Sequence, residues 1–152
     1  MTRPALIDAG EAIWTAAAAR RPWLRDLELV GVGWATVELE RAARELEADL
    51  DGAWVDGETD ELLGAFARLR SAMLDRVTLV LLEPSTEGRL AASLARFGEG
   101  VAAAYVAGPA AEPAALGAFA LSPPAQTPLG RASLVLDGPA WGPHVVVLEA
   151  AP

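Results

Sequence analysis

The sequence predicts an α+β domain made of two similar halves. Its 152 residues suit one domain with a single substantial core. Apolar segments rich in strand-forming residues alternate with segments in which apolar residues recur at helical spacing. After an N-terminal helix, the order is strand–helix–strands and then helix–strand–weak helix–strands. Two such halves of roughly 60 residues each are typical of an α+β domain.

The elements expected in the first half follow from composition and spacing. The N-terminal helix is interrupted by Arg20-Arg21-Pro22, and Asp56-Gly57 marks a turn. The helix after the first strand has i,i+4 charge pairs on its outer face. The expected segments are a helix over residues 5–20, a strand over 27–37, a helix over 39–50, an apolar segment over 62–69 and a strand over 77–82.

In the second half, Ser85 is expected to cap a helix that Gly98 ends. Leu90, Leu94 and Phe97 share one face of that helix. The alanine- and proline-rich segment 108–128 gives a weak signal, consistent with one short helix and a loop. Strands are expected over residues 101–106, 134–136 and 145–148, the last two joined by DGPAWGPH.

Composition excludes several classes of function. Twelve basic residues stand against 21 acidic ones, and a formal charge of −9 repels nucleic-acid phosphates. No apolar run reaches the roughly 18 residues of a membrane helix, so no membrane partner is expected. The absence of cysteine excludes disulfides, thiolate metal sites and cysteine nucleophiles. The N-terminus lacks the layout of a signal peptide, which predicts a cytoplasmic location.

Three stretches are characteristic: LVGVGWATVELERAARELEADL, VTLVLLEP with the later GEGVAAAYV, and LVLDGPAWGPHVVVLEA. They resemble the vicinal oxygen chelate superfamily, which includes glyoxalase I, methylmalonyl-CoA epimerase, extradiol dioxygenases and bleomycin-resistance proteins. The resemblance covers about residues 27–150 of a domain expected over 27–152, whereas residues 1–26 form an N-terminal helical extension. It implies a homodimer and two βαβββ modules, at about 27–84 and 85–150, whose curved sheet surrounds a ligand cleft.

In that family, two histidines and two carboxylate or amide side chains hold a metal ion. The resemblance places Gly31, Val80, Ala103 and Leu148 at these four positions, with Glu149 one residue out of phase. None of the four side chains offers an oxygen or nitrogen donor, and a divalent ion needs several. We therefore expect neither a metal site nor a cofactor.

Strand alternation, anchored on those positions, predicts which side chains line the cleft. The lining is small and apolar with three polar groups, which suits a mostly apolar organic ligand. Core or dimer packing is the default role for Trp141, which is also a candidate to cover the flat face of a ligand. The expected lining residues are Gly31, Gly33, Ala35, Thr78, Val80, Leu82, Ala103, Tyr105, His144, Val146 and Leu148.

Two of these polar groups are candidate catalytic residues. His144, the single histidine, suits a general acid or base, and the alternative is an exposed, inert side chain in a Gly-Pro-His turn. Tyr105 suits a hydrogen-bond donor to a ligand carbonyl, and the alternative is a core tyrosine with a satisfied hydroxyl. For Glu83 and Glu99 a structural role near helix ends is favoured over catalysis.

These observations predict a metal-independent protein that binds a mostly apolar small molecule or an acyl thioester. If it is an enzyme, acid–base chemistry by His144 and Tyr105 fits an isomerase, cyclase or lyase of specialised metabolism. One alternative is non-catalytic sequestration, as in bleomycin-resistance relatives. Another is a structural or regulatory subunit whose own side chains fill the cleft. The sequence does not identify the ligand.

Overall fold

The fold is described from a computed structural model, which covers residues 2–47, 53–70, 76–108, 121–136 and 138–149. Within these ranges the helices are α1 (Arg3–Arg20), α2 (Leu39–Glu47) and α3 (Arg89–Phe97), with a 3-10 helix at Pro22–Asp26. The strands are β1 (Glu28–Ala35), β2 (Val55–Asp60), β3 (Ala65–Arg70), β4 (Thr78–Pro84), β5 (Gly100–Ala107), β6 (Ala125–Thr127), β7 (Gly130–Leu134) and β8 (His144–Leu148). The predicted α+β class is confirmed.

The eight strands form one mixed sheet in the order β2-β3-β4-β1-β5-β8-β7-β6. In each half the first strand pairs in parallel with the last, as β1 does with β4 and β5 with β8. The two halves meet where β1 and β5 pair antiparallel. The first half is a βαβββ unit, whereas the segment between β5 and β6 includes residues 109–120, which lie outside the described ranges. The two halves are thus joined through their first strands.

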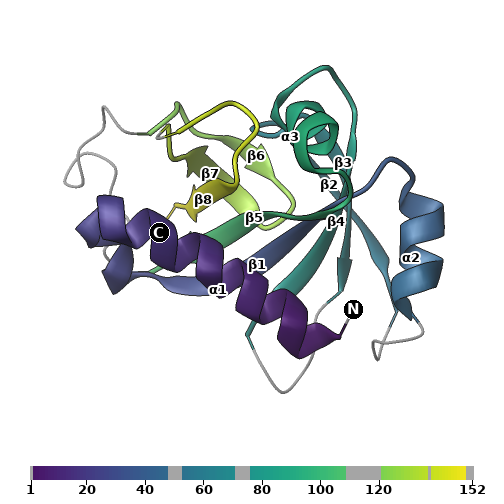
Figure 1. Ribbon diagram of the computed structural model, residues 1–152, viewed down its shortest axis with the longest axis horizontal. Helices are drawn as coiled ribbons and strands as arrows, with labels where there is room; N and C mark the ends of the chain where they lie inside the picture. The colour runs from purple at the N-terminus through teal and green to yellow at the C-terminus, as the bar shows by residue number, and fades with distance from the viewer. Residues whose placement is uncertain (1, 48–52, 71–75, 109–120, 137, 150–152) are drawn as a thin grey trace.

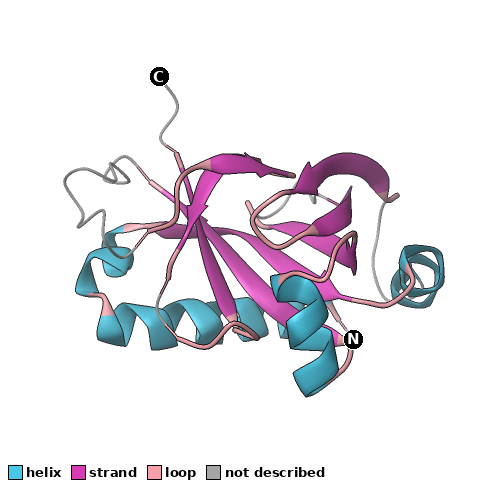
Figure 2. Ribbon diagram, turned by 90° about the horizontal axis from the view of Figure 1, so that it is seen from above, coloured by secondary structure: helices cyan, strands magenta, loops and turns pink. Residues whose placement is uncertain are grey.

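The sheet curves until its two edge strands meet (Figures 1 and 2). The amide of Glu61, the residue that follows β2, donates a hydrogen bond of 2.9 Å to the carbonyl oxygen of Gln126 in β6. A curved, nearly closed sheet has an outer and an inner face, and each face has its own apolar cluster. Side chains alternate between these faces along each strand.

Helix α1 covers the outer face and packs against β1, β5 and β8 (Figure 2). The hydroxyl of Thr2 caps it by accepting a hydrogen bond from the amide of Ala5. The helix is rich in alanine, and its small side chains allow close approach to the sheet. A Cβ atom added at Gly10 would lie 2.5 Å from Cγ2 of Val32. The N-terminal helix, which lies outside the family resemblance, is therefore part of the core.

The inner face is closed at one end by α3 and by the turn between β2 and β3. Leu90 of α3 and Leu63 of the turn are fully buried, and the amide of Leu90 donates to the carbonyl of Leu63. The expected end of α3 is confirmed, since Gly98 has a φ of 75°, which favours glycine.

Three local expectations are wrong. The strand expected over residues 134–136 lies earlier, since β7 covers Gly130–Leu134. Asp56-Gly57 lies within β2, a mostly exposed edge strand that forms because β3 pairs with it, although its sequence VDGETD has few strand-forming residues. Ser85 does not cap α3, which begins after Gly88 without a side-chain cap. The amide of Ser85 instead donates to the carbonyl of Gly64, so the chain first anchors to the turn and then enters the helix.

Candidate functional site

The structure brings the predicted lining residues together on the inner face of the sheet. Pairing between neighbouring strands arranges them in two rows. One row consists of Val80, Gly33, Ala103 and His144. The next row consists of Thr78, Gly31, Tyr105 and Val146. Leu148 follows on β8, opposite Ala132 of β7.

The protein's own side chains fill the space over these two rows. Val80, Ala103, Tyr105 and Val146 are buried to 1% exposure or less. A Cβ atom added at Gly31 would lie 2.5 Å from Cδ1 of Leu129 and 3.1 Å from Cβ of Tyr105. The glycine is therefore required by close packing, and the inner face at this position is filled rather than open.

Tyr105 is held by a buried carboxyl group. Its hydroxyl donates a hydrogen bond of 2.8 Å to Oδ2 of Asp60, and Oδ1 of Asp60 accepts from the amide of Leu63 at 2.9 Å. Both side chains have no exposed area. Burial raises the pKa of Asp60, and burial together with the Asp60 charge raises the pKa of Tyr105. Sequence reasoning missed Asp60 because its segment was expected to be a turn.

His144 is buried at the other end of its row. It is 4% exposed, so the exposed-turn alternative is wrong. Its Nε2 atom lies 3.2 Å from Oγ of Ser93, and that oxygen lies 2.6 Å from the carbonyl oxygen of Trp141. Two oxygens this close need the hydroxyl proton between them, so Ser93 donates to Trp141 and Nε2 donates to Ser93.

The electrostatics of His144 agree with a neutral ring. Burial, followed by the charge of Arg89, lowers the pKa of His144 to about 4. The ring is therefore neutral at pH 7. His144 and Tyr105 lie in neighbouring rows but bind different partners, Ser93 of α3 and Asp60 of β2.

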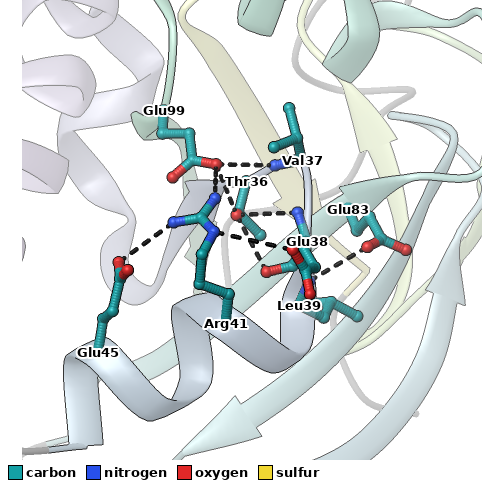
Figure 3. A network of polar contacts seen from close by, with 8 residues as sticks. All are labelled: Thr36, Val37, Glu38, Leu39, Arg41, Glu45, Glu83 and Glu99. Carbon is teal, nitrogen blue, oxygen red and sulfur yellow. Dashed lines mark hydrogen bonds and ion pairs between the residues drawn. The ribbon is translucent and has the colours of Figure 1, made fainter.

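Glu83 and Glu99 bind the connection between β1 and α2 (Figure 3). Oε2 of Glu99 accepts hydrogen bonds from Oγ1 of Thr36 at 3.0 Å and from the amide of Val37 at 3.1 Å, and it pairs with Arg41. Oε1 of Glu83 accepts from the amide of Leu39 at 3.1 Å. Arg41 lowers the pKa of Glu99. The two glutamates of LLEP and GEG thus stabilise the start of α2.

An open groove lies elsewhere, between α1 and α3. It has a volume of about 420 Å³ and is lined mainly by apolar side chains. Phe97 is 62% exposed at its rim, and Trp141 is 38% exposed. The guanidinium of Arg96 lies 4.9 Å from the centre of the Trp141 ring. The lining residues from α1 are Ala9, Ala12 and Ile13; those from α3 and the sheet include Ser93, Phe97, Gly98, Glu99, Val101 and Ala102.

Sequence reasoning identified Trp141 but missed this groove. The groove needs α1 beside α3, and α1 lies outside the part of the chain that carries the family resemblance. The sequence cue that could have indicated the groove is the apolar stretch from Ala9 to Ala19. In the structure several of its alanines are exposed rather than packed.

Comparison with known proteins gives matches in structure only: no protein-family model matches the chain, and no curated protein matches its sequence. Methylmalonyl-CoA epimerase from Mycobacterium tuberculosis aligns over 82% of this chain and 88% of that chain, with 21% identity and a TM-score of 0.65. A variant of the Streptomyces coelicolor methylmalonyl-CoA epimerase, in complex with 2-nitronate-propionyl-CoA, aligns over 80% and 97%, with 20% identity and a TM-score of 0.59. A hypothetical protein from Bacillus halodurans C-125 aligns over 83% and 97%, with 13% identity and a TM-score of 0.60.

The fold is that of the methylmalonyl-CoA epimerases. These enzymes belong to the vicinal oxygen chelate superfamily, so the fold that the resemblance implied is confirmed. Within the described ranges, no three histidine, aspartate or glutamate side chains gather closely enough to hold a metal ion. In the same ranges, no helix has the length and apolar character needed to cross a bilayer.

Proposed function

We propose that this protein binds a small, mostly apolar molecule in the groove between α1 and α3, without a metal ion. The observation that carries the proposal is the contrast between two places in the fold. The inner face of the sheet is filled by Tyr105, Leu129 and their neighbours, whereas the groove is open, apolar and about 420 Å³ in volume. A volume of this size is typical of small-molecule sites.

The side chains on the inner face do not fit a divalent metal ion. The positions that the family resemblance assigns to ligands hold Gly31, Val80, Ala103 and Leu148, which have no donor atoms. The nearby carboxyl group of Asp60 is bound by Tyr105 and Leu63. A metal ion needs several converging oxygen or nitrogen donors. The inner face therefore does not offer the donor set that a metal ion needs.

An acyl thioester is the ligand class that the structural comparison favours. The Streptomyces coelicolor epimerase with this fold was solved with an acyl-CoA analogue. The apolar groove suits the acyl part of such a ligand, and because the groove is open, the rest of the ligand can extend into solvent.

A second candidate function is a metal-independent isomerase or lyase that acts on such a thioester, since the structural neighbours include epimerases. His144 is neutral at pH 7, which suits a general base, but its Nε2 proton is bound to Ser93. Tyr105 is fully buried and bound to Asp60. Because neither group contacts the open groove directly, binding without turnover is the better supported function.

The filled inner face also favours the third alternative, a structural or regulatory subunit. That alternative requires no ligand, so a binding measurement separates it from the proposal. Homodimer formation and a cytoplasmic location stay predictions.

The test is titration with a neutral apolar fluorophore, N-phenyl-1-naphthylamine, and with octanoyl-CoA. Ala12 is exposed and lines the groove, so Ala12→Phe should fill the groove without disturbing the core. Ala19→Phe, on an exposed part of α1 that does not line this groove, is the matched control. We expect Ala12→Phe to weaken binding at least tenfold and Ala19→Phe to leave it unchanged.

The metal-free part is tested by the same titration after dialysis against EDTA, together with elemental analysis of the purified protein. We expect unchanged affinity. A stoichiometric divalent ion whose removal abolishes binding would overturn this part of the proposal. Equal binding by the native protein and Ala12→Phe would show that the site is elsewhere.

A further inference from the structure

The second half of α3 holds Trp141 at the rim of the groove. One face of this helix carries Ser93, Arg96 and Phe97, which stand at positions i, i+3 and i+4. The hydroxyl of Ser93 donates a hydrogen bond of 2.6 Å to the carbonyl oxygen of Trp141. The guanidinium of Arg96 lies 4.9 Å from the centre of the indole ring. The main chain and the ring of Trp141 are therefore both held against the same helix.

A buried contact supports this arrangement from below. Nε2 of His144 lies 3.2 Å from Oγ of Ser93 and donates to it, and the two side chains are 4% and 2% exposed. The hydroxyl oxygen of Ser93 thus accepts one hydrogen bond while its proton points to Trp141. A ring held in this way is pre-organised, because little side-chain freedom is left to lose when a ligand packs against it.

Phe97 places a second aromatic ring at the same groove. Its helical spacing from Leu90 and Leu94 predicted one shared apolar face. In the structure the two leucines pack in the inner-face cluster, whereas Phe97 is 62% exposed and lines the groove. Packing in the described core therefore does not account for this aromatic side chain.

The opposite side of the groove, formed by α1, has mostly small side chains. It consists of Ala9, Ala12 and Ile13. Small side chains leave an even wall, while Phe97 and Trp141 offer flat rings on the other side. Aromatic rings that pack against one another gain affinity beyond the burial of apolar area. A groove with these two sides suits a flat and rigid group.

We propose that the groove selects a ligand that carries a planar aromatic group, which packs against the rings of Trp141 and Phe97. This inference rests on the proposed function and adds the chemical class of the part that enters the groove. An acyl thioester with an aryl group satisfies both. A saturated group with the same carbon skeleton is thicker and has no π face, so it gains apolar burial alone.

The test compares 2-naphthol with trans-decahydro-2-naphthol, which has the same carbon skeleton and hydroxyl group but is fully saturated. Both compounds are uncharged at neutral pH, so charge does not separate them. A general apolar site binds the two about equally. We expect 2-naphthol to bind about fivefold more tightly in calorimetry on the full chain, because only its rings pair with aromatic side chains.

Trp141→Leu and Phe97→Leu each remove one ring and keep an apolar side chain. We expect each change to lower the ratio of the two affinities about threefold. Phe66→Leu is the matched control and should leave the ratio unchanged, because Phe66 is 49% exposed on β3 and does not line this groove. A folding defect would weaken both compounds together, so the ratio separates a lost ring contact from a lost fold.

A second readout locates the bound ring. Nuclear Overhauser effects are expected between the protons of 2-naphthol and the ring protons of Trp141 and Phe97. Arg96→Gln removes the guanidinium that lies over the indole and leaves both rings in place. It should weaken the effects to Trp141 more than those to Phe97. Saturating 2-naphthol without such effects to either ring would overturn the placement of the aromatic group.

The outcomes separate this inference from the proposed function. If the two compounds bind equally and Ala12→Phe weakens both, the groove stands as the site and the aromatic inference is overturned. If Ala12→Phe weakens neither compound, the proposed site fails and the inference fails with it. A preference for 2-naphthol that persists in both Trp141→Leu and Phe97→Leu would also overturn the inference, because the aromatic contact would then lie elsewhere.

Discussion

The hydroxyl of Tyr105 lies 2.8 Å from Oδ2 of Asp60 inside the nearly closed sheet, and neither side chain has exposed area. This pair joins the first strand of the second half to the last residue of β2. It lies on the face that surrounds the ligand cleft in the family the sequence resembles. A tyrosine that suits ligand binding by its position is therefore used for packing and for a buried hydrogen bond.

Tyr105→Phe should destabilise the fold, because it leaves a buried carboxyl oxygen of Asp60 without its donor. We expect a loss of about 1–3 kcal/mol in the free energy of unfolding, measured by urea denaturation. Tyr105→Phe with Asp60→Asn should cost less than the sum of the two single changes. Strict additivity would show that the two side chains do not interact.

Gly31→Val should also destabilise the fold, because the added side chain meets Leu129 and Tyr105. Overpacking of this kind costs about 1–3 kcal/mol. The double variant Gly31→Val with Leu129→Ala should recover part of that loss. If the inner face were an open cleft, Gly31→Val would leave stability unchanged and reduce ligand binding, and this result would contradict the filled face.

Stability should fall on acidification because of His144. The folded-state pKa of about 4 is below the usual value of 6.5, so the unfolded chain binds the proton more readily. The stabilisation that neutral His144 contributes to the fold is complete above pH 6.5 and is lost as the pH falls toward 4. At pH 5 the loss is about 2 kcal/mol relative to pH 7.5.

His144→Gln is the control for this pH dependence. The raised pKa of Asp60 has the opposite sign, since the folded carboxyl group takes up its proton first, and it is present in both proteins. The difference between the native protein and His144→Gln therefore isolates the histidine. Parallel stability curves between pH 7.5 and 5 would contradict a buried neutral ring.

Glu99→Ala should loosen the start of α2. It removes the acceptor for Thr36 and for the amide of Val37, with an expected loss of about 1 kcal/mol. The amide of Val37 should exchange with deuterium faster. Glu149→Ala removes a more exposed carboxylate that pairs with Arg131 and should stay within about 0.5 kcal/mol of the native protein. Equal effects of the two changes would mean that the network around Thr36 contributes no measurable stability.

Much of the fold was predictable, because it depends on patterns local to the chain. Apolar runs and helical spacing predicted β1, β4, β5 and β8 and the three α-helices to within a few residues. Gly98 correctly indicated the end of α3. The strand β2 was not predictable, since VDGETD becomes a strand only when β3 supplies its hydrogen bonds. The start of α3 depends likewise on the bond from Ser85 to Gly64, a residue of another turn.

The candidate site was predictable only in part. Alternation placed Gly31, Gly33, Val80 and Tyr105 correctly on one face, but it could not show that the face is filled. That depends on Leu129 and on the closure between Glu61 and Gln126, which join residues far apart in the chain. The partner of His144 was also invisible, because Ser93 lies on a different element.

The sequence by itself determined the fold class and the alternation of each strand, since these are properties of residue type and spacing. Only the tertiary structure decided which spaces are filled and which are open. The closing of the sheet buries Tyr105 against Asp60, while the packing of α1 beside α3 leaves the groove. Both outcomes depend on contacts between segments far apart in the chain, which local sequence patterns do not predict.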